Sequence, residues 1–196
     1  MRTTMRMLAL LTMFSAAAAC GVATQPVSNE TVAAFEVPLP QAKDRAEFLA
    51  ILRDAARVEG AHVDAASDDD LRDTGAAMPQ AKMSIHAAVW RGSDDKESWA
   101  TIMDQADHLG QVWIMFARGE NEKLALRFRE KAMREIKARW PGTLSLPIVD
   151  RSTIPLHSDL VRTPDGYRID PSAASKYSTG RRREVRSARG LVDAKL

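Results

Sequence analysis

The sequence has only one cysteine, Cys20, so no disulfide can form within the chain. It also lacks the GxSxG, GxxxxGK[ST] and HExxH patterns that mark common nucleophile, phosphate and zinc sites. Outside residues 7–19 there is no long uncharged apolar run. These absences leave the fold to depend on packing alone. They indicate no enzyme class, and we expect no cofactor.

The first 19 residues have the pattern of an export leader. Arg2 and Arg6 form a short positive region, and residues 7–19 are thirteen residues without a charge, ending in the small side chains of residues 16–19. Thirteen helical residues span about 20 Å, less than the roughly 30 Å hydrocarbon core of a bilayer. The pattern therefore predicts a secretory signal peptide rather than a permanent transmembrane helix.

Cys20 directly follows this leader. The stretch Ala17-Ala18-Ala19-Cys20 resembles the lipobox of bacterial lipoproteins. The resemblance implies that Cys20 becomes the mature N-terminus and carries acyl chains such as palmitate, which would anchor the protein to a membrane. Lipoproteins commonly have Leu three positions before the Cys, where this chain has Ala17. Ordinary signal-peptidase cleavage after an Ala-x-Ala sequence is the alternative.

Charge is distributed unevenly along the chain. The net charge is +2, but residues 176–195 carry seven basic and two acidic side chains, a net of +5. With the two leader arginines also set apart, residues 20–175 have a net charge of −5. We predict a signal peptide (1–19), a flexible tether (20–30), a single α+β domain (31–170) and a basic, disordered tail (171–196).

Hydrophobic periodicity indicates an α+β fold. Two segments, 44–59 and 120–140, place apolar residues at helical spacing with charges on the opposite face, and predict long amphipathic helices. Strands are expected at 31–39, 61–65, 83–91, 111–118 and 143–149, with a hairpin at 160–169. Residues 67–70 form an acidic N-cap cluster before a short helix or loop, and residues 98–104 fit a strand or a helix, with a strand preferred.

This order favours a two-layer sandwich in which a mostly antiparallel sheet packs against two long helices, loosely similar to a ferredoxin-like fold. Pro147 is expected to place the strand at 143–149 on a sheet edge. The apolar run at 111–118 is expected to be a central strand covered on both faces.

Histidines and carboxylates give only weak indications of a metal site. The four histidines are His62, His86, His108 and His157. Asp104, Asp107 and His108 would share a face only in a helix, and the acidic clusters at 68–70 and 94–95 lack the EF-hand pattern. We expect no metal site, and interpret these residues as polar turns and helix caps.

The remaining candidates for recognition are aromatic and basic. Trp90, Trp99 and Trp113 alternate with apolar neighbours and are expected in the core, the alternative being an exposed aromatic binding face. The tail is a candidate for contact with an anionic surface such as phospholipid headgroups, and export argues against nucleic acid. The basic residues concerned are Arg181, Arg182, Arg183, Arg186 and Arg189.

Three hypotheses follow. The first is a lipoprotein of the bacterial cell envelope, facing the periplasm or the exterior, whose α+β domain binds a small ligand, an envelope protein or a cell-wall component. A soluble periplasmic or secreted protein is the alternative localisation. The second is a periplasmic hydrolase or metal-dependent enzyme that uses His86 or His108 with nearby carboxylates. The third is a structural envelope protein whose basic tail touches lipid.

Overall fold

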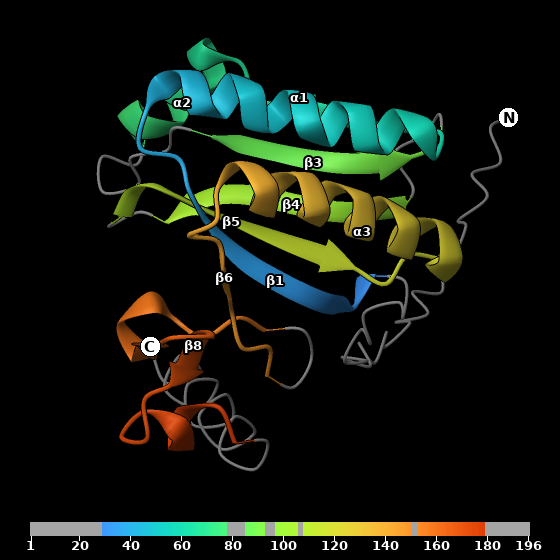
Figure 1. Ribbon diagram of the computed structural model, residues 1–196. Coiled ribbons are helices and arrows are strands. Elements are labelled where there is room, and N and C mark those ends of the chain that lie inside the picture. The colour runs from blue at the N-terminus through green and yellow to red at the C-terminus, as the bar shows by residue number, and fades with distance from the viewer. Residues whose placement is uncertain (1–28, 78–84, 93–96, 106–107, 150–152, 179–196) are drawn as a thin grey trace, which may run out of the picture.

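The sheet of this protein contains eight strands and is mostly antiparallel, as a computed structural model shows (Figure 1). The structure describes residues 29–77, 85–92, 97–105, 108–149 and 153–178. The strands in the order of the sheet are β2 (Ala61–Ala65), β3 (His86–Arg91), β4 (Glu97–Gln105), β5 (His108–Ala117), β1 (Thr31–Pro38), β6 (Leu144–Ser145), β8 (Gly166–Ile169) and β7 (Leu160–Thr163).

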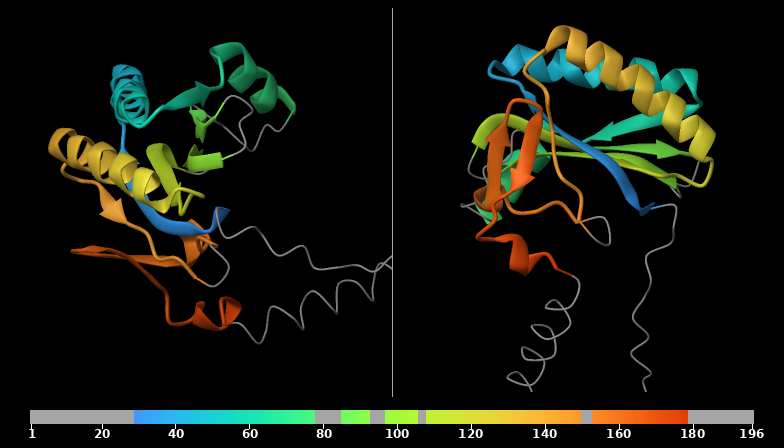
Figure 2. Two further views of the ribbon diagram at one scale, coloured as in Figure 1. Left: turned by 90° about the vertical axis from the view of Figure 1, so that its right-hand side faces the viewer. Right: turned by 60° about the horizontal axis from the view of Figure 1, so that its bottom comes forward.

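The helices are α1 (Ala42–Val58), the shorter α2 (Asp68–Ala77) and α3 (Glu122–Arg139). Helices α1 and α3 lie side by side over one face of the sheet (Figures 1 and 2). The α+β sandwich expected from the sequence is therefore confirmed. From β1 to β6 the elements follow the strand–helix–strands–helix–strand order of ferredoxin-like folds, except that α2 and a four-strand meander lie between the two long helices.

The main core lies between these helices and the sheet. Helix α1 buries Phe48, Leu52 and Ala55, as its periodicity predicts. Helix α3 likewise buries Phe128 and Ile136. Because these side chains recur every three or four residues, each helix presents one continuous apolar stripe to the sheet.

The segment at 98–104 is part of β4, which confirms the preferred strand. A bulge explains why its pattern also fitted a helix. Val89 pairs with Ala100 and Trp90 pairs with Ser98, so Trp99 is an extra residue in β4. Trp99 and Ala100 are consecutive yet both buried, which breaks the alternation of a regular strand.

Two expectations about the C-terminal third were wrong. The strand expected at 143–149 is much shorter, because β6 contains just Leu144–Ser145. It also lies between β1 and β8 rather than at a sheet edge. Leu146 still donates its N–H to the Ala34 carbonyl, but Pro147 has no N–H and the pairing ends there. The tail was expected to start at Pro171, yet residues 171–178 form turns and the 3₁₀-helix η4 (Ala174–Lys176).

The hairpin at 160–169 is confirmed as β7 and β8, joined at Pro164 and Asp165. We call residues 153–178 the C-terminal arm. In both views of Figure 2 the arm lies across the sheet from α1 and α3. A second, smaller apolar cluster lies where the arm meets β1 and β5, and it contains Ala34, Trp113 and Leu146.

Candidate functional site

Glu36 is the most unusual residue of the sheet. It lies near the middle of β1, in the apolar stretch Ala-Ala-Phe-Glu-Val-Pro-Leu, and is only 5% exposed. Its neighbour Val37 faces the main core under the helices, so the Glu36 side chain points to the opposite face, toward the arm. A carboxylate in such a place needs hydrogen-bond donors, because burying an uncompensated charge costs several kcal/mol, on the order of 5.

The donors come from β5 and from the arm. Trp113 Nε1 donates to Glu36 Oε2 at 3.0 Å, and the Tyr167 hydroxyl donates to Glu36 Oε1 at 2.7 Å. His157 Nε2 lies 3.5 Å from Oε2. With its amide nitrogen turned toward the carboxylate, Gln111 donates to Oε1 at 2.9 Å. We call these five residues the Glu36 cluster.

The aromatic rings of the cluster also pack together. The His157 ring lies between Tyr167 at 5.6 Å and Trp113 at 6.3 Å, measured between centroids. Burial, the hydrogen bond to Glu36 and the negative charge of Glu36 together raise the pKa of Tyr167 to about 12. Tyr167 therefore stays a neutral donor at physiological pH, and its high pKa makes it a weak acid. Both carboxylate oxygens are engaged by protein donors, so the arrangement suits docking of the arm better than proton transfer.

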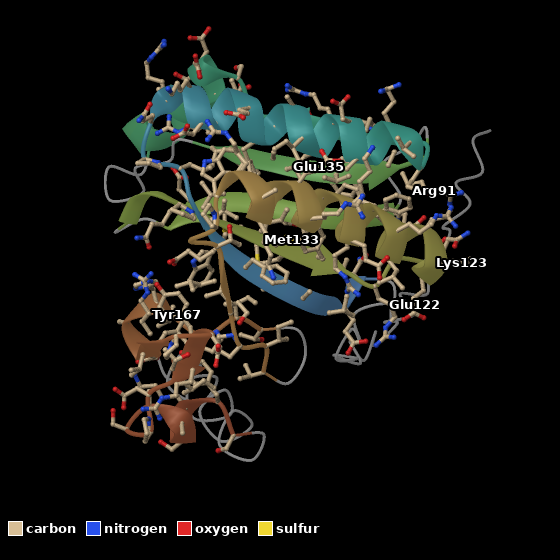
Figure 3. The ribbon with its side chains drawn as sticks, in the orientation of Figure 1. Arg91, Glu122, Lys123, Met133, Glu135 and Tyr167 are labelled. Atoms are coloured by element: carbon tan, nitrogen blue, oxygen red, sulfur yellow. The ribbon has the colours of Figure 1, made fainter. Side chains whose placement is uncertain are left out.

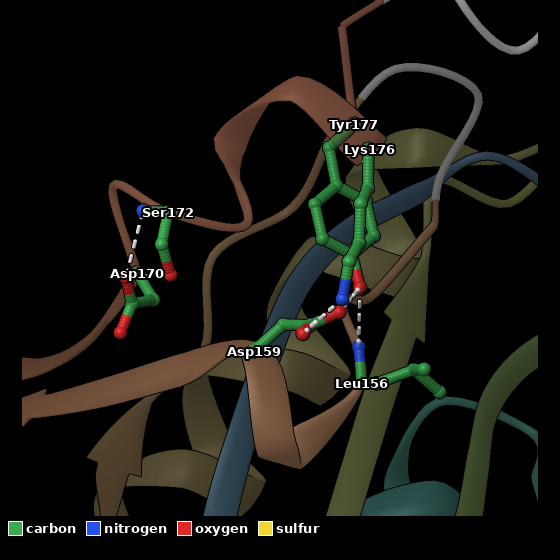
Figure 4. A network of polar contacts seen from close by, with 6 residues as sticks. All are labelled: Leu156, Asp159, Asp170, Ser172, Lys176 and Tyr177. Carbon is green, nitrogen blue, oxygen red and sulfur yellow. Dashed lines mark hydrogen bonds and ion pairs between the residues drawn. The ribbon is translucent and has the colours of Figure 1, made fainter.

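A second polar network holds the end of the arm (Figure 4). Asp159 is 6% exposed and accepts hydrogen bonds from Lys176 Nζ at 2.7 Å and from the Tyr177 hydroxyl at 2.6 Å. The Leu156 N–H donates to the Tyr177 oxygen at 3.0 Å. The hydrogen bonds from Lys176 and Tyr177 lower the pKa of Asp159. These four residues, the Asp159 latch, fix η4 to the start of the arm.

A third buried carboxylate, Glu97, lies at another part of the sheet, where β4 meets α3. Its Oε1 accepts from Trp99 Nε1 at 2.7 Å and from the Asn121 N–H at 3.1 Å, and its Oε2 accepts from Arg91 at 3.3 Å. Burial raises the pKa of Glu97, but the hydrogen bonds outweigh it, so the pKa is lowered overall. Figure 3 shows Arg91 far from Tyr167, so the carboxylates Glu97 and Glu36 form separate networks.

The structure places His86 and Asp104 apart. His86 is exposed on β3 and pairs with Met103 of β4. Asp104, which follows Met103 in β4, is buried on the helix-covered face. His86 and Asp104 thus lie on opposite faces of the sheet. His108 begins β5, but its side chain lies outside the described part of the chain, as does Asp107.

Among the described residues, no group of three or more His, Cys, Asp or Glu side chains is arranged to hold a metal ion. The acidic cluster at 68–70 begins α2: the Asp70 N–H donates to Ser67 Oγ, and the Ser67 N–H donates to Asp70 Oδ2. This is a capping arrangement, as expected. The acidic pair at 94–95 lies outside the described residues.

Two of the three expected core tryptophans are buried, Trp99 fully and Trp113 to 4% exposure, and Trp90 is half-buried on β3. Cys20 and the five arginines of the tail lie outside the described residues. In the part of the chain that the structure describes, no helix is both long and apolar enough to cross a membrane.

Sequence reasoning missed the Glu36 cluster. Its members come from β1, β5 and the arm, and Tyr167 is 131 residues from Glu36. One local signal was present: a charged residue inside an apolar strand implies either an exposed strand edge or a buried partner. Nothing in the sequence around Glu36 indicated which residues would be its hydrogen-bond partners.

These features define an α+β protein whose C-terminal arm is held to the sheet by the buried carboxylate of Glu36. No protein-family model, curated protein or solved structure matches the chain.

Proposed function

We propose that this protein is a lipid-anchored component of the bacterial cell envelope whose α+β domain binds an envelope partner. The observation that carries the proposal is the leader of residues 1–19 followed directly by Cys20, the only cysteine. An acylated Cys20 would tether the domain to the membrane, since two or more acyl chains make a stable anchor.

The start of the folded domain supports this arrangement. Glu30, just before β1, accepts hydrogen bonds from Arg118 Nε and NH2 at 3.0 and 2.8 Å, and its carbonyl accepts from the Arg118 N–H at 2.8 Å. Glu30 is ten residues after Cys20 in the sequence. Ten residues reach at most about 35 Å when extended. Such a tether would hold the domain close to the bilayer.

The sheet face beside the arm is the best candidate for the binding surface. The arm packs against the β1–β5 half of this face, whereas His62, Asp64 and His86 on the β2–β3 half are exposed. Trp90 pairs with His62 and is half-buried on the same face. Aromatic side chains with polar neighbours are typical of recognition surfaces.

The helical face, in contrast, uses its charges internally. Arg127 on α3 donates to Glu59 just after α1 at 2.7 Å, and Arg139 donates to Glu47 at 2.6 Å. These pairs connect the two helices to each other, so their charges are already matched.

The anchor is tested by mass spectrometry of the mature N-terminus, comparing the natural chain with Cys20→Ala. We expect acyl mass on Cys20 and membrane fractionation that is lost in the variant. A protein that stays in the membrane fraction with no acyl mass on its N-terminus would contradict the anchor.

The binding face is tested by placing a photo-crosslinking residue at His86 and, as a matched control, at Val58, which is 59% exposed at the end of α1. We expect a discrete cross-linked envelope partner, or cross-linking to cell-wall material, from position 86 only. Equal cross-linking from both positions would refute the choice of face.

A further inference from the structure

Strand β2 forms one edge of the sheet, and its backbone groups alternate between β3 and the open side. Ala66, directly after β2, donates its N–H to the His86 carbonyl at 2.9 Å. In an antiparallel pair every second residue faces the partner strand, and the β2–β3 register has no irregularity. The N–H and C=O groups of Ala61, Val63 and Ala65 therefore point away from β3, to a side on which no described strand pairs with them.

The sequence of β2 does little to close this edge. Exposed sheet edges are usually protected by proline, by lysine or by a bulge. Strand β2 reads Ala-His-Val-Asp-Ala and pairs with β3 without a bulge. Its one formally charged residue, Asp64, would disfavour a strand that brings a carboxylate opposite it. The edge is therefore open to a further strand of matching charge.

Strand β2 is complementary to itself. When two copies of β2 run antiparallel about Val63, each Val63 faces Val63 of the other copy, and each Ala61 faces Ala65. These are the residues whose backbone groups point outward, so the pairs can exchange about six hydrogen bonds, two per pair. The edge that one copy leaves open is thus the edge that the other copy requires.

The side chains between these pairs select the same register. His62 and Asp64 are both exposed, on the face beside the arm. Pairing about Val63 places His62 of each copy opposite Asp64 of the other, so an imidazole N–H can donate to a carboxylate at two symmetric positions. A slip of two residues, which keeps the backbone bonds, brings Asp64 opposite Asp64 or His62 opposite His62. Only the register about Val63 matches the two side chains.

We propose that this protein forms a homodimer in which β2 pairs with β2 of a second copy and the sheet continues across both chains. Directly opposite residues of antiparallel strands point to the same face, so α1 and α3 of both copies cover one face and both arms lie on the other. Pairing would also cover the half-buried Val63 and Ala65, which pack on the main core from its edge. This dimer is separate from the proposed Cys20 anchor and needs no acyl chain.

The first test is disulfide trapping in the full chain with Cys20→Ala, so that an introduced thiol is the only one. In Val63→Cys the pairing brings two thiols opposite each other, with their Cα atoms about 5.5 Å apart, within the range of a disulfide. His62→Cys is the matched control. Its Cα lies diagonally from its own copy at about 7–8 Å, too far for a good disulfide. Because His62 is exposed and Val63 is half-buried, random collisions favour position 62 and the proposed pairing favours position 63.

The second test is sedimentation of the same Cys20→Ala chain over a range of concentrations. An interface based on one strand pair is small, so we expect a reversible equilibrium between monomer and dimer. His62→Asp alone or Asp64→His alone places like groups opposite each other at two positions, and should weaken the dimer about tenfold. The two substitutions together exchange the partners and should restore it. Urea unfolding of each variant checks that the fold is kept, and the double variant decides if a single one does not fold.

Disulfide formation that is as fast at position 62 as at position 63 would overturn the proposal. So would a chain that stays monomeric, or a dimer that the single substitutions leave unchanged or the double variant fails to restore. A mixed disulfide between position 63 and a different protein of an envelope extract would mean that the edge takes another partner's strand, and would also overturn the homodimer. None of these results bears on the acylation of Cys20, which is read by mass spectrometry of the natural chain.

Discussion

The Glu36 cluster makes a quantitative prediction about stability. Glu36→Gln keeps the shape of the side chain but replaces one acceptor oxygen by an NH2 donor. Trp113 and Tyr167 donate to different oxygens of Glu36, at 3.0 and 2.7 Å. With the glutamine oxygen on Trp113, the Tyr167 hydroxyl must turn and accept from the NH2 group, so two hydrogen bonds to a charged carboxylate are replaced by two weaker neutral ones.

The cost follows from these contacts. A hydrogen bond to a charged group contributes about 1.5–3 kcal/mol and a neutral one about 0.5–1.5 kcal/mol, so replacing two of them costs about 2–3 kcal/mol. Part of this cost is recovered, because burying a neutral glutamine requires less desolvation free energy than burying a charged carboxylate. We therefore expect Glu36→Gln to lower the free energy of unfolding by about 1–3 kcal/mol.

The assay is urea unfolding followed by tryptophan fluorescence, to which Trp113 contributes. Glu30→Gln is the control, since Glu30 is also a hydrogen-bonded carboxylate next to β1, but its side chain is half exposed. A surface pair of this kind is worth about 0–1 kcal/mol. Equal unfolding midpoints for the two variants would refute the view that Glu36 holds the arm to the sheet.

Three further predictions concern the arm. Gly166→Ala should destabilise the protein by about 2 kcal/mol or more in urea unfolding, because Gly166 has φ +145° and a Cβ there would collide with Ser145, whose carbonyl oxygen lies 2.6 Å from that position. Because the pKa of Tyr167 is raised to about 12 from about 10, the unfolded state loses this proton first, and the free energy of unfolding should fall as pH rises from about 10 to 12. Tyr177→Phe removes the hydroxyl that donates to Asp159 and should speed amide exchange in the arm about tenfold, for a loss of about 1.4 kcal/mol.

Each has a control. Gly92→Ala also places alanine at a positive φ, +93°, but in open space, so it should cost only about 1 kcal/mol. If it costs as much as Gly166→Ala, the collision is not the cause. In Tyr167→Phe the alkaline fall should be smaller than in the natural protein, and an unchanged slope would exclude Tyr167 as its source. Ser178→Ala should leave exchange in the arm unchanged, because among the described residues its hydroxyl donates to the nearby Ser175 carbonyl and takes no part in the Asp159 latch.

The local structure was largely readable from the sequence, because the apolar periodicity of each segment matches the face that it buries. Phe48 and Leu52 on α1 are examples, and the hairpin of β7 and β8 has the expected turn at Pro164 and Asp165. The exceptions have local causes. A bulge at Trp99 breaks the alternation of β4.

What the sequence could not provide is long-range pairing. A short strand such as β6 has too few residues for a pattern, and its position between β1 and β8 depends on contacts across the chain. The order at 171–178 was missed for a similar reason. A polar composition suggested disorder, but Lys176 and Tyr177 find their partner in Asp159, which lies 17 and 18 residues earlier. The Glu36 cluster is the extreme case, with partners 77 and 131 residues away.

The position of β1 has a consequence for how the chain acquires its structure. As the first strand it lies between β5 and β6, so Phe35 pairs with Ile114 on one side and with Ser145 on the other. Contacts between residues so distant in sequence slow folding, because a large loop must close before they form. A chain that crosses a membrane from its N-terminus delivers β1 long before either neighbour. Under the proposed export, the sheet could not close until residue 145 had passed through, so this topology would delay folding for as long as translocation needs an extended chain.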